Sequence, residues 1–200
     1  SVTSIGNSAF LGCTSLTNVI IPEGVTEIET YAFENCVSLK SIVIPEGVTN
    51  SYSYSYGDEV NGKYSYWFRG CSSLESITLP STLKLLPEEG FDGCSSLKNI
   101  TLPKGITKIP INCFNGCSAL SEIICESPIT SVGGAAFAGC TSLKTFDLSS
   151  VESLGAGAFR LSGLTSAIIP EAITSIPSEL FQGCSDLETV IMHDNITSIG

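Results

Sequence analysis

The sequence predicts a solenoid, in which repeated units stack along one axis. Phenylalanine recurs along the chain, mostly at intervals of 23 residues. A cysteine follows three residues after seven of these phenylalanines, and a leucine follows three residues after each of those cysteines. An alternating apolar segment comes next and usually ends in proline. The phenylalanines lie at Phe10, Phe33, Phe68, Phe91, Phe114, Phe137, Phe159 and Phe181.

Eight units fill the chain, and a ninth begins at Ile196. One unit buries too few side chains to offset the entropy of ordering its residues, so we expect a single domain over 1–200. The unit that begins at Ile129 is one residue short after its apolar segment, where Ser-Ser replaces Pro-Glu-Gly. The third unit carries an insertion of 12 residues, which we place within 50–64. The eight units begin at Val2, Val25, Val48, Leu83, Ile106, Ile129, Val151 and Ile173.

The alternating segment of each unit predicts a strand, as in 39–45. Successive side chains of a strand point to opposite faces, so Ile42 and Ile44 are expected inside the coil and Val43 outside. Proline has no amide hydrogen to donate, so Pro45 should end the hydrogen-bonded ladder.

The segment around each phenylalanine predicts a short helix. In the first unit, Ala9 and Cys13 are four residues apart and would share one helical face. Only a turn or two of helix fits before the following strand.

Composition excludes several classes of function. The net charge of −11 opposes binding to nucleic acid, because phosphates would meet a surface of like sign. No apolar run approaches the roughly 18 residues that a membrane span requires, so we expect no membrane insertion of this segment. No signal peptide is found in these 200 residues.

The pattern Leu-x-x-Ile-x-Ile-Pro-x-x-Val-x-x-Ile-Gly-x-x-Ala-Phe-x-x-Cys resembles the BspA-like, treponemal class of leucine-rich repeats, over the whole chain except the insertion. The resemblance implies a leucine-rich-repeat solenoid, mainly β: a right-handed coil with a parallel sheet on the concave side and short helical turns on the convex side. It also implies a bacterial cell-surface or secreted protein, since several relatives are associated with adhesion. It supplies no catalytic residues.

The in-register cysteines are expected to be buried, reduced thiols. Neighbouring copies would lie about 4.8 Å apart with parallel Cβ vectors, whereas a disulfide needs facing Cβ atoms about 3.8 Å apart. No Cys-x-x-Cys occurs, and the one histidine, His193, lies nine residues from the nearest cysteine. We therefore expect no metal and no cofactor. The single histidine and the lack of a nucleophile or phosphate-loop motif also indicate that the protein is not an enzyme.

The outward strand positions form the second candidate site. Their central row is aliphatic in five of eight units, on a face that water should reach. The row is either a result of β-propensity alone or an apolar concave surface for a partner, and both interpretations stay open. Its aliphatic members are Ile20, Val43, Ile124, Ile168 and Ile191, and the others are Thr78, Thr101 and Asp147.

The stretch 50–68, which contains the insertion, is the first candidate site, because it gathers five of the six tyrosines and the one tryptophan. Two segments that alternate with period two flank a turn-rich centre and predict a hairpin. The rings share one face or split between two faces, depending on the turn. They then form a protruding recognition patch or a cover on the solenoid flank, and we favour recognition. The residues are Tyr52, Tyr54, Tyr56, Tyr64, Tyr66 and Trp67.

Together these features predict a non-enzymatic binding or adhesion segment of a bacterial cell-surface or secreted protein. The expected partner is a protein of a host surface or extracellular matrix. Two alternatives stay open: a structural spacer that displays another domain, and a carbohydrate-binding surface on which tyrosine rings stack against sugars.

Overall fold

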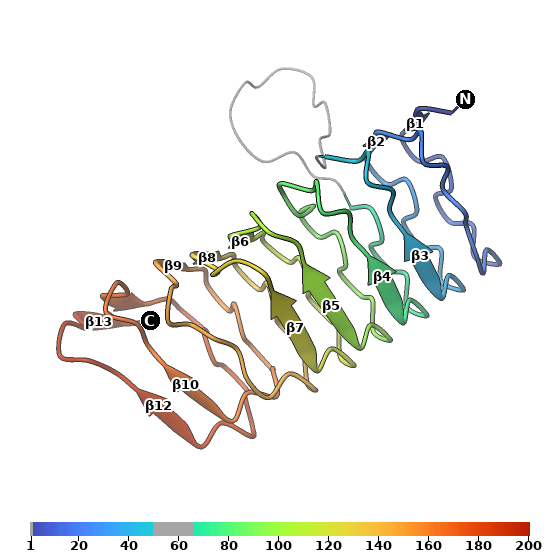
Figure 1. Cartoon of the computed structure of the whole chain (residues 1–200). Helices are drawn as coiled ribbons and strands as arrows, with labels where there is room; N and C mark the ends of the chain where they lie inside the picture. The colour runs from blue at the N-terminus through green and yellow to red at the C-terminus, as the bar shows by residue number, and fades with distance from the viewer. Residues whose placement is uncertain (1, 50–65) are drawn as a thin grey trace.

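The computed structural model describes residues 2–49 and 66–200, and it confirms the predicted solenoid. The chain winds in about eight turns, which stack side by side from the N-terminal end to the C-terminal end (Figure 1). The predicted insertion, 50–64, lies outside the described residues.

The alternating apolar segments form parallel strands on one side of the coil. Their burial alternates as expected, with exposed Ser41 and Val43 on either side of buried Ile42. Equivalent residues of successive turns stand side by side, so Ile42 pairs in register with Ile77. The strands are β3 (Ser41–Val43), β4 (Ser76–Thr78), β5 (Asn99–Leu102), β7 (Glu122–Cys125), β10 (Ser166–Ile168) and β12 (Thr189–Ile191).

A second series of two-residue strands, which we did not predict, follows the first around the coil (Figure 1). Each lies within the first four residues of a unit, as β2 lies within 25–28, where Thr26 N donates to Thr3 O at 2.9 Å. These strands are β1 (Ser4–Ile5), β2 (Glu27–Ile28), β6 (Lys108–Ile109), β8 (Ser131–Val132), β9 (Ser153–Leu154), β11 (Ser175–Ile176) and β13 (Ser198–Ile199).

The parallel sheet is not continuous along the coil. The first series divides into the ladders β3–β4, β5–β7 and β10–β12, and the second into β1–β2, β6–β8–β9 and β11–β13. The first series is interrupted before β10 and the second before β11. No strand ladder therefore joins the turns from β10 onward to the turns before them.

The core is a column of phenylalanine rings and cysteine thiols. Successive phenylalanine rings stack nearly parallel, with centroids 5.2 to 6.1 Å apart. Six thiols donate to the carbonyl oxygen of the phenylalanine one turn before, as Cys94 does to Phe68 at 3.1 Å. The thiols therefore act as hydrogen-bond donors as well as apolar filling.

The predicted helices are absent, since the described residues contain no helix and therefore no helix long and apolar enough to cross a membrane. Each segment around a phenylalanine holds two residues of positive φ, such as Ser8 at 57° and Gly12 at 69°. A right-handed helix cannot contain this backbone conformation. The amide of Phe10 donates instead to Ala32 O of the next turn, at 2.8 Å. We call these segments the turn side.

Candidate functional site

The predicted aliphatic row lies on the outside of the first strand series, which we call the sheet face. Its five aliphatic side chains are exposed as expected, from 48% for Ile124 to 85% for Ile20. Strand register aligns them, with Val43 beside Thr78 and Ile168 beside Ile191. The row therefore exposes aliphatic side chains to water. That these side chains contact a partner stays a prediction.

The backbone ladder under this row breaks in the sixth unit. Along the regular turns, Ser121 N donates to Lys98 O at 3.0 Å, and later Thr165 N donates to Lys144 O at 3.1 Å. Lys144 and Ser121 are both described, and no equivalent hydrogen bond joins Lys144 N to Ser121 O. Residues 145–148 form no strand, although the repeat predicts one there.

Two features of the sequence account for the break. Phe146 occupies an inward position where neighbouring units have Ile123 or Ala167, and its larger ring packs tilted against Phe137 at 5.0 Å between centroids. The carboxylate of Asp147 accepts a hydrogen bond from Ser149 N at 2.9 Å. An aspartate that bonds the backbone two residues ahead makes a turn, which ends the extended conformation.

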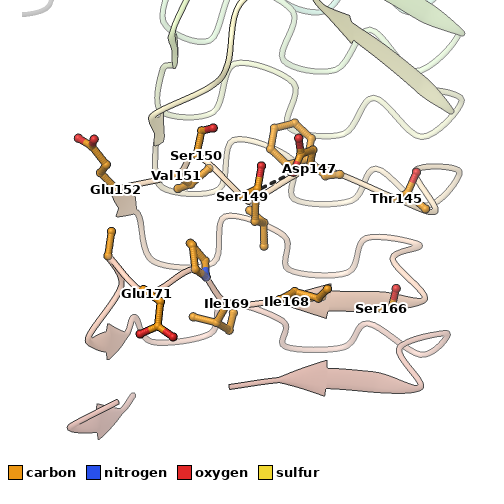
Figure 2. A pocket seen from close by; sticks show the side chains of 15 residues that line it. Thr145, Asp147, Ser149, Ser150, Val151, Glu152, Ser166, Ile168, Ile169 and Glu171 are labelled. Carbon is orange, nitrogen blue, oxygen red and sulfur yellow. Dashed lines mark hydrogen bonds between the residues drawn. The ribbon is translucent and has the colours of Figure 1, made fainter. Parts of the chain in front are cut away.

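Open grooves lie on both sides of this irregular segment. The larger, of about 670 Å³, is lined by 145–152 and 166–172, and Figure 2 shows it between the irregular chain and β10. The smaller, of about 540 Å³, lies toward β7. Ile123 and Cys125 of β7 are only half-buried beside it, whereas Ile100 and Leu102 of β5 are buried.

The larger groove is apolar at its floor and negatively charged at its rim. Asp147, Glu152 and Glu171 are exposed carboxylates in its lining. The hydrogen bonds from Ser149 hold the pKa of Asp147 below its usual value, because they favour the charged form. Glu171 accepts from Asn195 Nδ2 at 3.0 Å and lies 3.3 Å from His193 Nδ1.

One predicted tyrosine, Tyr66, lies among the described residues that follow the insertion. Tyr66 is half-buried, and its ring stacks on Tyr31 at 4.8 Å with Arg69 over its face at 5.4 Å. The other predicted tyrosines lie outside the described residues. They are Tyr52, Tyr54, Tyr56 and Tyr64.

The prediction that Trp67 belongs to a recognition patch was wrong. Its side chain is fully buried, and the indole Nε1 donates to Ile28 O at 3.0 Å. Trp67 directly precedes Phe68, so it occupies the repeat position held by Ala32 one unit earlier, which faces the core. A buried side chain cannot contact a partner.

The densest acidic group of the sequence is Glu88, Glu89 and Asp92, and it lies on the turn side beside Arg69. The Arg69 guanidinium is 3.5 Å from Glu89 and 3.6 Å from Asp92, and Asn115 Nδ2 donates to Asp92 at 2.9 Å. Burial raises the pKa of Asp92 in spite of these partners. Glu89 and Asp92 are thus paired within the protein, and no cluster of metal-ligating side chains is found in the described ranges.

The buried cysteines form no reactive site. Burial raises the pKa of the Cys71 and Cys140 thiols to about 12, and it raises those of Cys94, Cys113 and Cys117 far above the usual value. A thiol must ionise to act as a nucleophile, so these groups are inert at neutral pH. All nine cysteines are free thiols, among which Cys13 is exposed and Cys125 and Cys184 are half-buried.

The groove is the feature that sequence reasoning missed. Its signals were present: the unit is one residue short, and its inward position holds Phe146 instead of an aliphatic residue. The one charged residue of the central row, Asp147, was a third signal.

Comparisons with known proteins find the same repeat. A family model for the BspA type leucine rich repeat region matches in six copies, over residues 1–63, 63–162 and 120–200. A leucine-rich repeat protein from Bacteroides ovatus is 32% identical with a TM-score of 0.73, and the match covers all of this chain and 55% of that one. The chain therefore spans about half the length of that relative.

Two further solved structures share the fold. A leucine-rich repeat protein of T. pallidum is 26% identical over 88% of this chain and 67% of its own, with a TM-score of 0.50. The pneumococcal vaccine antigen PcpA is 23% identical over 99% of this chain and 54% of its own, with a TM-score of 0.52. No curated protein matches the sequence. From the repeat, the coil and the family match, the chain belongs to the BspA-type leucine-rich repeat family.

Proposed function

We propose that this segment binds a partner protein through its sheet face, without catalysis, as part of a bacterial cell-surface or secreted protein. The observation that carries the proposal is the exposed aliphatic row aligned by strand register. The partner we propose is a protein of a host surface or of the extracellular matrix.

The physical argument rests on exposed apolar area. A strand needs only alternation to fold, and Thr78 and Thr101 show that a polar side chain fits the central row. Five units nevertheless expose a branched aliphatic side chain there. Aliphatic groups that lose water on contact with a partner contribute about 25 cal/mol per Å². A line of them along a rigid coil suits a long contact with another protein.

Family membership supports a binding segment rather than an enzyme. Repeat families of this kind place variable side chains on a constant scaffold, and function comes from those side chains. PcpA is described as a vaccine antigen, which accords with the surface location that we propose here.

Two other functions stay as alternatives. A spacer would need no apolar row, so the row favours binding. Carbohydrate binding would depend on the tyrosines of 50–64, which lie outside the described residues, and we keep it as a second proposal for that segment.

The test is retention of the protein on a panel of immobilised matrix proteins and host cells. Ile124→Ser, Ile168→Ser and Ile191→Ser are combined in one variant, which should lose retention by tenfold or more. The matched control changes Leu11, Ile111 and Leu161 to Ser, which are exposed aliphatic residues of the turn side. Equal loss in both variants, or no loss in the first, would contradict the proposal. A glycan array run in parallel tests the carbohydrate alternative.

A further inference from the structure

We propose that the groove lined by 145–152 and 166–172 binds an extended basic segment of a partner protein, in which Arg or Lys alternates with apolar residues. The inference rests on the proposed function, because it assigns a chemical class of partner to one part of the sheet face. It depends on three features of the groove, namely its opening, its floor and its charge.

The groove exists because two adjacent turns of the coil lack backbone hydrogen bonds to each other on one side only. Lys144 O accepts from Thr165 N at 3.1 Å before the groove, and Gly157 N donates to Ser178 O at 2.9 Å beyond it. Between these points, the described residues 145–154 form no backbone hydrogen bond with 166–176. The two turns are therefore joined at both ends and separated in the middle.

The separation leaves backbone groups available to a ligand. Residues 145–148, all of them described, donate or accept no ladder hydrogen bond on either side, toward 121–126 or toward 166–169. An extended peptide can add to such a segment through its own backbone, as in strand addition. Its alternate side chains would then point into the groove and away from it.

The floor of the groove fits aliphatic chains. Ile168 is 65% exposed, and buried Val151 and Ile169 line the groove together with half-buried Phe146 and Pro170. The volume of about 670 Å³ is within the range of small-ligand sites, roughly 300–1,000 Å³. The methylene stem of Arg or Lys can lie on such a surface while its charged end stays at the rim.

The charges at the rim of the groove favour a positively charged ligand. Asp147, Glu152 and Glu171 line the groove, and the lining contains no Lys, Arg or His. Lys144 stands next to the groove but is bound to Asp186 at 2.7 Å. Asp147 stands between Ile124 and Ile168 in the row, and the hydrogen bond from Ser149 N lowers the pKa of its carboxyl group, which favours the charged form. A basic segment would meet opposite charge at these three carboxylates, whereas an acidic one would be repelled.

The test uses the 200-residue chain and three synthetic peptides, each with five residues that alternate Val with Arg, Glu or Ser. Backbone amide chemical shifts of the labelled protein report binding and its location. The Arg peptide should shift amides of 145–152 and 166–172, and its affinity should fall at least fivefold between 50 and 300 mM salt, since counterions screen the carboxylates. The Glu and Ser peptides should bind at least tenfold more weakly.

The variants separate the groove from general negative charge. Asp147→Asn keeps the acceptor for Ser149 N and removes the charge, and it should weaken the Arg peptide at least fivefold. Glu27→Gln removes an exposed carboxylate of β2 far along the coil and should change nothing. Shifts spread over all acidic surfaces, equal binding of the Ser peptide, or no effect of Asp147→Asn would overturn the inference.

The outcome is distinguishable from that of the proposed function. If the panel proteins bind and depend on Ile168 but not on Asp147, the sheet face binds a partner and the basic segment is wrong. If no panel protein binds but the Arg peptide occupies the groove, the groove stands and the choice of panel partners is wrong.

Discussion

The indole Nε1 of Trp67 donates a hydrogen bond to the carbonyl oxygen of Ile28, 3.0 Å away and one turn earlier in the coil. In regular turns, the equivalent carbonyl accepts from a backbone amide of the next turn, as Val132 O does from Gly155 N at 2.8 Å. A side chain therefore takes the place of a ladder donor directly after the insertion. Trp67 seals the core where the repeat is interrupted.

Trp67→Phe should lower the free energy of unfolding by about 2–3 kcal/mol, because it leaves the buried Ile28 carbonyl without its donor. Trp67→Ala should cost more, about 3–5 kcal/mol, since it also empties a fully buried site. Urea denaturation followed by circular dichroism measures both. Equal stability of the wild type and the Phe variant would show that the hydrogen bond contributes nothing.

The sequence contains enough information to predict that Trp67 is buried. It lies beside a tyrosine-rich stretch, which favoured an exposed ring. Its place in the repeat, directly before Phe68, is buried in every other unit except the first, where Ala9 is exposed, and that phase predicts burial. The outward row was predicted correctly for the same reason, because strand alternation fixes the direction of Val43 and Ile168.

The turn side was predicted wrongly because residue spacing alone cannot distinguish a helix from a turn that also contains residues of positive φ. Ala9 and Cys13 have helical spacing, but Gly12 between them has a positive φ. The informative signal was glycine directly before cysteine in most units, since glycine adopts this conformation without strain. The second strand series was missed because two residues carry no periodicity.

Gly116→Ala tests the turn side directly. Gly116 has a φ of 71°, and an added Cβ would meet only ordinary contacts at 3.6 Å, so the cost is conformational. We expect a loss of about 1–2 kcal/mol. Gly134→Ala is the matched control, since Gly134 has similar space, with the nearest atom at 3.4 Å, and no positive φ. Thermal and urea denaturation of both should show a loss only for Gly116→Ala.

The buried thiols make stability depend on alkaline pH. Burial raises the pKa of Cys140 from its usual value of 9.0 to about 12. Below pH 9 the thiol is protonated in both states and its contribution is complete. Between pH 9 and 12 the unfolded chain ionises while the folded one does not, so stability falls as pH rises.

Cys140→Ala should therefore flatten the fall of unfolding free energy between pH 9 and 12 by up to about 1.4 kcal/mol per pH unit, the value for one proton. Cys13→Ala, at an exposed thiol, is the matched control for the loss of a thiol group. Denaturation in urea at pH 8, 9, 10 and 11 measures the slopes. Parallel curves for Cys140→Ala and the wild type would contradict the assignment.

Nine thiols should titrate in denaturant without reductant, and a count of three or fewer would show cross-linking.

The last prediction concerns the cause of the groove. If the missing residue and Phe146 open the coil, then replacing 145–150 with the seven-residue sequence of 99–105 should close it, because that segment forms the regular strand β5 and its turn. The closed ladder regains several backbone hydrogen bonds, each of which contributes about 0.5–1.5 kcal/mol, so unfolding free energy should rise by about 2 kcal/mol. Amides of 166–168 should become more protected from hydrogen exchange.

Phe146→Ile alone is the control for this replacement, because it restores the usual inward side chain and keeps the unit one residue short. It should leave the groove open, with little gain in exchange protection, since the turn from Asp147 to Ser149 still ends the strand. The Arg peptide should then bind Phe146→Ile and fail to bind the replaced chain. If both proteins keep the groove, the opening arises from packing elsewhere in the coil. If both lose it, the phenylalanine alone holds the two turns apart.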